Sequence, residues 1–278
     1  MSNWFMDWLR RASGLPFPET ERIKMSGFKL GKLDPVKLLE TPAFGDFTGH
    51  ASTWPAVKPR GWEYAVPADQ LDCLGNDEIG LCVIAAMNHY AQAETWNTSN
   101  PLTPTKQLTI ETYTAITGYD PKDLSTDQGT CWIDALRYWK KHGIPMLDKN
   151  GKEVIHQILG WASLDLGSIA QQRYACDLFG GTLMGIQCPK SALDNTDDWQ
   201  YVPGSPIEGG HGINRAGQGG AGWHIGSWGI WIKGTWSFSL HLADEDYGVV
   251  TKSWIDSATG QSPSGLDLNG LLAAMKAL

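Results

Sequence analysis

The 278-residue sequence predicts an α+β fold with two lobes, in which a helical lobe precedes an antiparallel β-sheet or barrel lobe. Three observations support this prediction. Residues 76–178 carry apolar residues mostly at helical spacing, residues 179–262 form short aromatic and β-branched runs separated by glycine, and residues 1–65 show no sustained period. We therefore expect an extended N-terminal arm at 1–65 and one domain at 66–278.

The expected helices have start and stop signals. "NDEIGLCVIAAMNHY" (76–90) is a glycine-opened turn followed by a helix that Cys82 begins. Thr103-Pro104 is typical of a helix start, and Gly118 of the stop that follows. Three further stretches are predicted as helices: "GTCWIDALRYWKKHG", "DLGSIAQQRYACDLFGG" and the closing "LNGLLAAMKAL" at about 266–278. In the arm, a short helix is expected near Trp4–Arg10.

The expected strands follow residue 180. They are "GTLMGIQCP", "HGINRAG", "GWHIGSWGIWI" and "YGVVTKSWI". The acidic run "DEDY" at 244–247 is predicted to be a solvated turn. The tryptophans are expected to be mostly core residues, although Trp223, Trp228, Trp231 and Trp236 could partly line a groove.

Composition excludes several functional classes. The net charge of −8 disfavours binding to nucleic acid or to an anionic membrane surface. No apolar run reaches membrane-spanning length, and the N-terminus lacks the basic-then-apolar order of a secretion signal. No histidine or acidic cluster has metal-ligand spacing, so no metal and no cofactor are expected. Five cysteines without a Cys-x-x-Cys pair predict free thiols: Cys73, Cys82, Cys131, Cys176 and Cys188.

Cys82 is the candidate nucleophile, because the partial positive charge of a helix N-terminus lowers the pKa of a thiol. Taken locally, the same pattern also fits an inert buried thiol. A possible partner is His211, which lies 129 residues downstream in "EGGHGI", close to the spacing of papain-type Cys–His pairs. Asn76 stands six residues before the cysteine, and Ser227-Trp228-Gly229 begins sixteen residues after the histidine.

This ordered set resembles the papain-like cysteine peptidase superfamily. More narrowly, it is similar to uncharacterised papain-like proteins of bacteriophages and prophages with a "GND…GDC" motif, matched here by "LGNDEIGLCVIAAMNHY". Further matching stretches cover roughly residues 65–278: "YTAITGYDPKDLSTDQGT", "ALRYWKKHGI", "QCPKSA", "GGHGI", "SWG" and "DEDYGVVTKSWI".

The resemblance implies a role for each matching residue. Cys82 is expected to be the nucleophile, His211 the general base and acid, and Asn76 the side-chain donor to the oxyanion, together with the backbone N–H of Cys82. Trp228 is expected to shield the histidine. Gly80 and Gly210 are expected to border the substrate groove with Trp228.

The sequence departs from the family pattern at two positions. Gly226 stands where the asparagine that orients the histidine is expected, so Ser227, His224 and Asn214 are the candidate substitutes. Leu81 replaces the aspartate that precedes the cysteine in the narrower group. In addition, "INRAGQGGAG" follows the histidine where an apolar strand is usual, which predicts a β-bulge.

Other titratable residues are interpreted as structural. Cys131-Trp132 imitates a papain-like Cys-Trp pair, but only 80 residues separate Cys131 from His211. The other three cysteines are expected to be packing thiols. His89 and His142 are also expected to be structural.

Three functions follow from these residues. The first is a cysteine hydrolase of phage or prophage origin that cuts a peptide or isopeptide bond in a peptide or protein substrate. The second is a catalytically decayed relative, a structural or docking component of a virion that contacts phage structural proteins through the arm. The third is a peptidoglycan amidase. The expected location is the host cytoplasm or the phage virion.

Overall fold

The computed structural model describes residues 29–36, 41–48, 60–61, 66–98 and 100–254. The helices expected near Trp4–Arg10 and at about 266–278 lie outside the described residues. Among the described residues, no helix is both long and apolar enough to cross a membrane.

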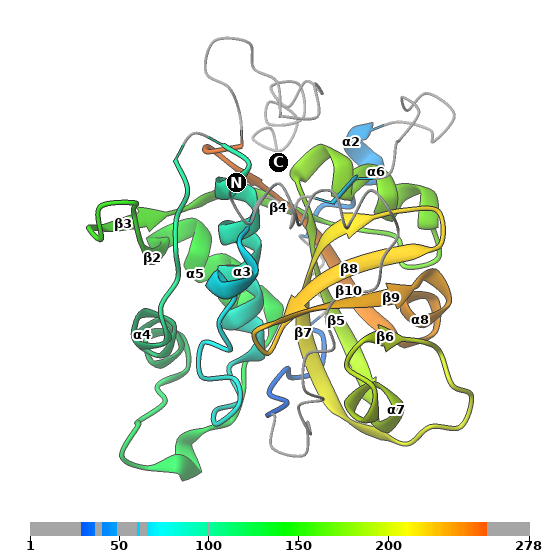
Figure 1. Cartoon of the computed structure of the whole chain (residues 1–278), viewed down its shortest axis with the longest axis horizontal. Coiled ribbons are helices and arrows are strands. Elements are labelled where there is room, and N and C mark those ends of the chain that lie inside the picture. The colour runs from blue at the N-terminus through cyan, green and yellow to red at the C-terminus, as the bar shows by residue number, and fades with distance from the viewer. Residues whose placement is uncertain (1–28, 37–40, 49–59, 62–65, 99, 255–278) are drawn as a thin grey trace, which may run out of the picture.

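Helices dominate the first half of the described chain (Figure 1). The three long helices of this half surround one buried cluster, which contains Cys82, Trp132 and Trp139. The helices are α2 (Gly45–Thr48), η3 (Ala68–Gln70), α3 (Cys82–Trp96), α4 (Lys106–Thr117), η4 (Leu124–Thr126), α5 (Trp132–His142), α6 (Ile169–Phe179), α7 (Lys190–Asp194) and α8 (Trp236–Leu242).

Local signals explain the helix ends. Gly118 and Gly180 end α4 and α6 in the left-handed region, at φ 77° and 76°, where glycine has no Cβ to strain. The start of α4 differs from the sequence prediction. Its N-cap is Thr105, whose Oγ1 accepts from the Leu108 N–H at 3.3 Å, whereas the backbone of Thr103 pairs with Leu147.

The strands form one large sheet and one hairpin. The large sheet has the order β4-β10-β5-β7-β8-β9-β6, with β1 paired to β7, and β2 pairs with β3 separately. All neighbours in the large sheet are antiparallel except β6 and β9. The strands are β1 (Arg60–Gly61), β2 (Ile144–Leu147), β3 (Glu153–His156), β4 (Ile158–Ser163), β5 (Thr182–Pro189), β6 (Asp198–Trp199), β7 (Ile207–Gln218), β8 (Gly222–Ser227), β9 (Ile230–Thr235) and β10 (Ala243–Thr251).

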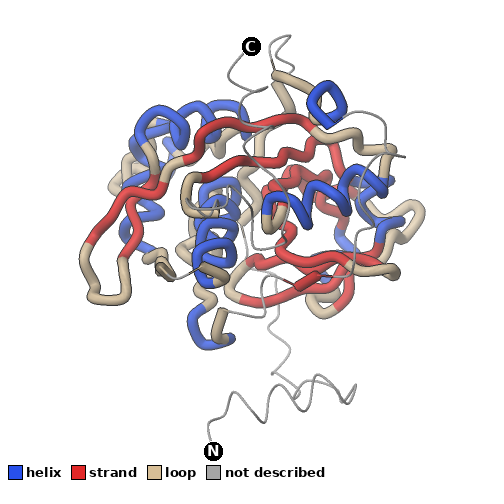
Figure 2. Tube along the Cα trace, turned by 90° about the horizontal axis from the view of Figure 1, so that it is seen from above, coloured by secondary structure: helices blue, strands red, loops and turns tan. Residues whose placement is uncertain are grey.

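The central strand β5 joins two cores. Because side chains alternate along a strand, Leu183 enters the cluster around α3, whereas Met184 and Ile186 enter a second cluster with Trp199 and Trp223. Helix α3 packs on β7 at the boundary between these cores. Viewed from above, the strands do not lie in one flat layer (Figure 2). This α+β architecture confirms the predicted fold class.

Several local predictions need correction. Strands β2, β3 and β4 lie within the stretch expected to be mostly helical. The "DEDY" run is not a solvated turn, because it lies in β10 and three of its four residues are buried. Trp228 and Trp236 are buried in the second core rather than lining an open groove. Trp223 is buried there too, but it also borders a surface pocket together with Gly222 and His224. The expected bulge is confirmed by a register shift between Arg215 and Gly217.

Candidate active site

Cys82 is the first residue of α3 and is buried, with 1% of its surface exposed. Its Sγ accepts the backbone N–H of Gly212, on β7, at 3.3 Å. Burial raises the pKa of the Cys82 thiol, while the backbone N–H groups of Gly212 and Gly31 and the charge of Lys32 oppose that rise. The thiol therefore lies where the first helix turn meets the strand that carries His211.

This contact depends on the glycine at 212. A Cβ there would lie 2.9 Å from Val83 Cγ2 and 3.2 Å from Trp132 Cζ2. Any larger residue would therefore separate β7 from the start of α3.

His211 is fully buried on β7. Its Nε2 lies 2.8 Å from Ser227 Oγ, and its Nδ1 has no hydrogen-bond partner among the described residues. Burial lowers the pKa of His211 to about 3, so the ring is neutral at pH 7. Of the three candidates for orienting this ring, Ser227 makes the contact, whereas Asn214 Oδ1 accepts from the Gly226 N–H at 3.2 Å.

Trp228 covers the imidazole. The two rings stack with centroids 4.2 Å apart and an interplanar angle of 15°. Trp228 has φ 50°, a conformation uncommon for a residue with a Cβ, in the turn between β8 and β9. The turn therefore holds the indole against His211, which is the place expected for a shielding tryptophan.

Asn76 is also buried, but both hydrogens of its amide are engaged. Nδ2 donates to the Ile79 carbonyl at 3.0 Å and to the Lys29 carbonyl at 3.1 Å. The second acceptor belongs to the N-terminal arm. Gly80, expected to border the groove, donates its N–H to Asp127 at 2.9 Å and lies against Gly31 of the same arm.

The arm segment Lys29–Leu33 thus lies at the site, a position that no sequence signal indicated. Lys32 N–H donates to the Gly210 carbonyl at 3.1 Å, so Gly210 borders this segment. In Figure 1 the segment is drawn in blue at the lower end of the boundary between the helices and the sheet.

The other thiols and the two histidines interpreted as structural have contacts away from Cys82 Sγ. Cys131 occupies the N-cap position of α5 without a side-chain capping hydrogen bond. Its Sγ lies 3.2 Å from Asp134 Oδ2, and burial raises the pKa of the thiol. Cys176 and Cys188 are buried, and Cys73 is half-buried. His89 Nε2 lies 2.9 Å from the Asp72 carbonyl, and the His142 ring lies 4.8 Å from the Tyr138 ring, tilted by 32°.

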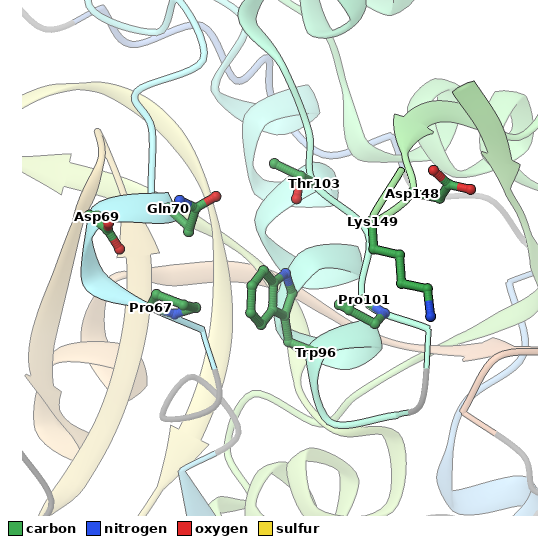
Figure 3. A pocket seen from close by; sticks show the side chains of 8 residues that line it. All are labelled: Pro67, Asp69, Gln70, Trp96, Pro101, Thr103, Asp148 and Lys149. Carbon is green, nitrogen blue, oxygen red and sulfur yellow. The ribbon is translucent and has the colours of Figure 1, made fainter. Parts of the chain in front are cut away.

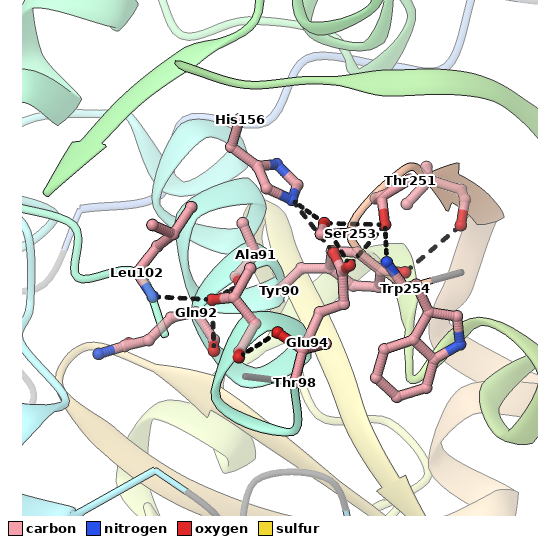
Figure 4. Close-up of polar contacts among 12 residues, drawn as sticks. Tyr90, Ala91, Gln92, Glu94, Thr98, Leu102, His156, Thr251, Ser253 and Trp254 are labelled. Atoms are coloured by element: carbon pink, nitrogen blue, oxygen red, sulfur yellow. Dashed lines mark hydrogen bonds and ion pairs between the residues drawn. The ribbon is translucent and has the colours of Figure 1, made fainter. Parts of the chain in front are cut away.

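Two other features lie away from Cys82. One is a surface pocket (Figure 3), lined by Pro67, Asp69, Gln70, Trp96, Pro101, Thr103, Asp148 and Lys149. The other is a polar cluster at the far end of α3 (Figure 4), in which buried Glu94 contacts His156 at 3.2 Å and Ser253 at 2.7 Å. The Glu94 carboxylate and the His156 imidazole therefore tie α3 to β3 and to the end of β10. Within the described ranges, no group of histidine, cysteine and acidic side chains could hold a metal ion.

Comparison with known proteins adds fold neighbours. No family model matches the chain, and no curated protein matches it either. Among solved structures, xylellain, a cysteine protease from Xylella fastidiosa, has a TM-score of 0.60 at 16% identity and covers 84% of this chain and 99% of its own. The ragweed pollen allergen Amb a 11, a cysteine protease in its proform, has a TM-score of 0.55 at 14% identity. The match covers 88% of this chain and 84% of the allergen chain. Procathepsin B from Trypanosoma congolense has a TM-score of 0.51 at 11% identity. The match covers 91% of this chain and 99% of the procathepsin chain.

These neighbours are papain-like cysteine proteases, and the chain shares their fold. The predicted papain-like architecture is therefore confirmed at the level of the fold.

Proposed function

We propose that this protein is a papain-like cysteine hydrolase that cleaves amide bonds of peptides or proteins. The observation that carries the proposal is the meeting of two elements: Gly212 N–H binds Cys82 Sγ at 3.3 Å, and the adjacent His211 is held through Nε2 by Ser227 at 2.8 Å. Acyl transfer through a thiol needs a nucleophile, a base that comes within hydrogen-bond reach of it and a group that orients the base. Cys82 and His211 make no hydrogen bond to each other in this structure, since His211 Nδ1 has no partner among the described residues. The proposal is therefore supported by the neighbouring positions of the two residues and by the hydroxyl that holds the imidazole.

The residues suggest the following steps. His211 takes the thiol proton at Nδ1, the ring nitrogen that Ser227 leaves free, and the sulfur attacks the carbonyl carbon of the substrate. The oxyanion accepts from the Cys82 N–H and from Asn76 Nδ2, once Lys29 has left that amide. His211 then protonates the departing amine and the C–N bond breaks. Water, deprotonated by His211, releases the acid from the thioacyl intermediate.

The test uses a peptidyl vinyl sulfone, which forms a stable thioether only with an activated thiol. The full chain is incubated with this reagent and adducts are located by mass spectrometry. We expect one adduct on Cys82, lost in His211→Ala and retained in the control Cys131→Ser. Modification of Cys73 in preference to Cys82 after prolonged incubation contradicts the proposal.

We further propose a phage or prophage origin, supported by the motif set from "LGNDEIGLCVIAAMNHY" onward. The Ser227–His211 contact favours an active enzyme over a decayed structural component, because a hydroxyl fills the role that Gly226 leaves open. Peptidoglycan remains an alternative substrate. A zymogram on purified cell wall, set beside one on a soluble protein substrate, separates the two, and clearing of cell wall alone indicates an amidase.

A further inference from the structure

The arm segment Lys29–Leu33 crosses between the two cores and hydrogen-bonds to both sides. On the helical side, Leu33 N–H donates to the Thr130 carbonyl at 3.0 Å, and Thr130 N–H donates to the Gly31 carbonyl at 2.9 Å. On the sheet side, Lys32 N–H donates to the Gly210 carbonyl at 3.1 Å. Extended peptides are commonly recognised through such main-chain pairing, which leaves selectivity to side-chain pockets.

The segment is closely fitted to its surroundings. A Cβ on Gly31 would lie 1.8 Å from the Gly80 carbonyl oxygen, and one on Gly129 would lie 2.1 Å from the Gly31 oxygen. A Cβ on Gly210 would lie 2.2 Å from the Lys32 oxygen. Each of these separations is shorter than any real Cβ contact, so the segment lies here because glycine occupies all three positions.

Lys32 shows where side-chain selectivity arises. Its side chain is fully buried, and Nζ lies 3.0 Å from Asp244 Oδ2 and 3.2 Å from Glu245 Oε1. Gly185 makes room for the alkyl stem, since a Cβ there would lie 2.2 Å from Lys32 Cε.

The two carboxylates are also held by neutral side chains of the sheet. Gln187 Nε2 donates to Asp244 Oδ2 at 2.6 Å, and the Tyr247 hydroxyl donates to Glu245 Oε2 at 2.8 Å. A charge buried in this way needs an opposite charge beside it. When a peptide covers the acidic pair in place of the arm, a cationic side chain at this position restores the pairing that Lys32 makes.

We propose that Gly185, Asp244 and Glu245 form a lysine-selective subsite beside Cys82, and that Lys29–Leu33 is its resident occupant, which an incoming peptide must displace. Calling that peptide a substrate rests on the proposed function, whereas its binding does not. The segment also engages the amide of Asn76, so its departure frees that donor as well. Preferred substrates carry a Gly-Lys pair, as the arm does.

The experiment measures binding without turnover. The full-length double variant Gly31→Leu/Cys82→Ala is used, because a side chain on residue 31 cannot fit beside Gly80. Circular dichroism checks its folding. Two fluorescent peptides are titrated by anisotropy: KLGKLD, the sequence of residues 29–34, and a matched peptide in which norleucine replaces the second lysine.

We expect the lysine peptide to bind at least about tenfold more tightly than the norleucine peptide. The preference should disappear when Asp244→Asn and Glu245→Gln are added. Equal affinity for the two peptides, or no binding of either, would contradict a lysine-selective subsite. Selective binding by a chain whose Cys82 never forms a thioether would instead contradict the proposed function alone.

A second measurement covers the case in which the double variant does not fold. Lys32→Met in the otherwise intact chain removes the anchor of the segment. Alkylation of Cys82 by iodoacetamide should then accelerate about tenfold or more, since the segment opens more often. The Lys32 charge lowers the Cys82 pKa and its loss acts in the opposite direction, so the rates are compared at a pH above the thiol pKa of both proteins. Lys190→Met, which breaks an exposed ion pair with Asp194, is the control and should leave the rate unchanged. An unchanged rate in Lys32→Met would contradict the claim that Lys29–Leu33 occupies the subsite.

Discussion

At the scale of single residues, a hydroxyl holds the His211 ring, although Gly226 stands where the resemblance leads us to expect an asparagine. The expected position is Gly226, and a Cβ there would lie 3.0 Å from the Trp231 ring. The next residue along β8, Ser227, places its hydroxyl on Nε2 instead. In the proposed mechanism, the short side chain of Ser227 orients the ring in place of the asparagine.

Replacing Ser227 tests this role. Ser227→Ala removes a buried hydrogen bond, worth about 1–3 kcal/mol, from the ring that accepts the thiol proton in the proposed mechanism. We expect alkylation of Cys82 to slow about tenfold and its pH profile to shift, because the ring orientation and basicity change together. Ser227→Thr keeps the hydroxyl and is the matched control. A Ser227→Ala variant with an unaltered pH profile would show that the hydroxyl only packs.

The buried histidine also predicts how stability depends on pH. Burial lowers the pKa of His211 to about 3 from the ordinary 6.5, so the unfolded chain binds a proton more readily than the native chain does. The native state is therefore destabilised as pH falls from about 6.5 toward 3.

His211→Gln removes this contribution. Between pH 7 and 4 the wild type should lose roughly 3 kcal/mol more unfolding free energy than the variant does, as measured by urea titration. The control is His142→Gln, because His142 is exposed and should follow the wild type. Parallel curves for wild type and His211→Gln would contradict the buried neutral ring.

At the scale of elements, the site depends on how closely β7 approaches α3. Gly212→Val should destabilise the fold by about 1–3 kcal/mol, because its side chain meets Val83 and Trp132 at short distance. It should also slow alkylation of Cys82, since the two elements separate. Thermal unfolding and alkylation rates measure both effects. Gly220→Ala is the control, because nothing lies within 4 Å of its Cβ position. Equal stability of the two variants would contradict close packing at 212.

At the scale of the whole molecule, a buried ion pair joins distant parts of the sheet. Arg215 on β7 lies 2.9 Å from Asp246 on β10, both side chains are fully buried, and Gln172 on α6 accepts from the same guanidinium at 3.0 Å. The pair therefore links the helix α6 to both strands that flank β5.

Replacing one member of this pair should lower the free energy of unfolding more than replacing both members does. Arg215→Met leaves Asp246 buried without its partner and should lower the free energy of unfolding by about 3–5 kcal/mol. Adding Asp246→Leu should recover part of that loss. Lys106→Met, which breaks an exposed pair with Glu78, should change stability by less than about 1 kcal/mol. Urea unfolding of the four proteins checks the order, and a double variant no more stable than Arg215→Met would contradict it.

Sequence patterns predicted the fold class, the longer helices and the main strands, because periodicity reports which face of an element is buried. They also placed Cys82 at a helix start and His211 on a strand. The hairpin β2–β3 and strand β4 were not predicted, since their short, alternating runs stand next to strong helix signals. The "DEDY" run was misread because charged residues are seldom buried without partners, and its partners Lys32 and Arg215 are distant in sequence.

By itself, the sequence determined the α+β class and the order of the candidate catalytic residues, since both depend on local periodicity and spacing. The tertiary structure decided which hydroxyl contacts His211 and what fills the site beside Cys82. Lys32 and Asp244 stand 212 positions apart, and no local pattern connects them. Their pairing arises only when the arm packs between the two cores, where a buried lysine requires the carboxylates that β10 supplies.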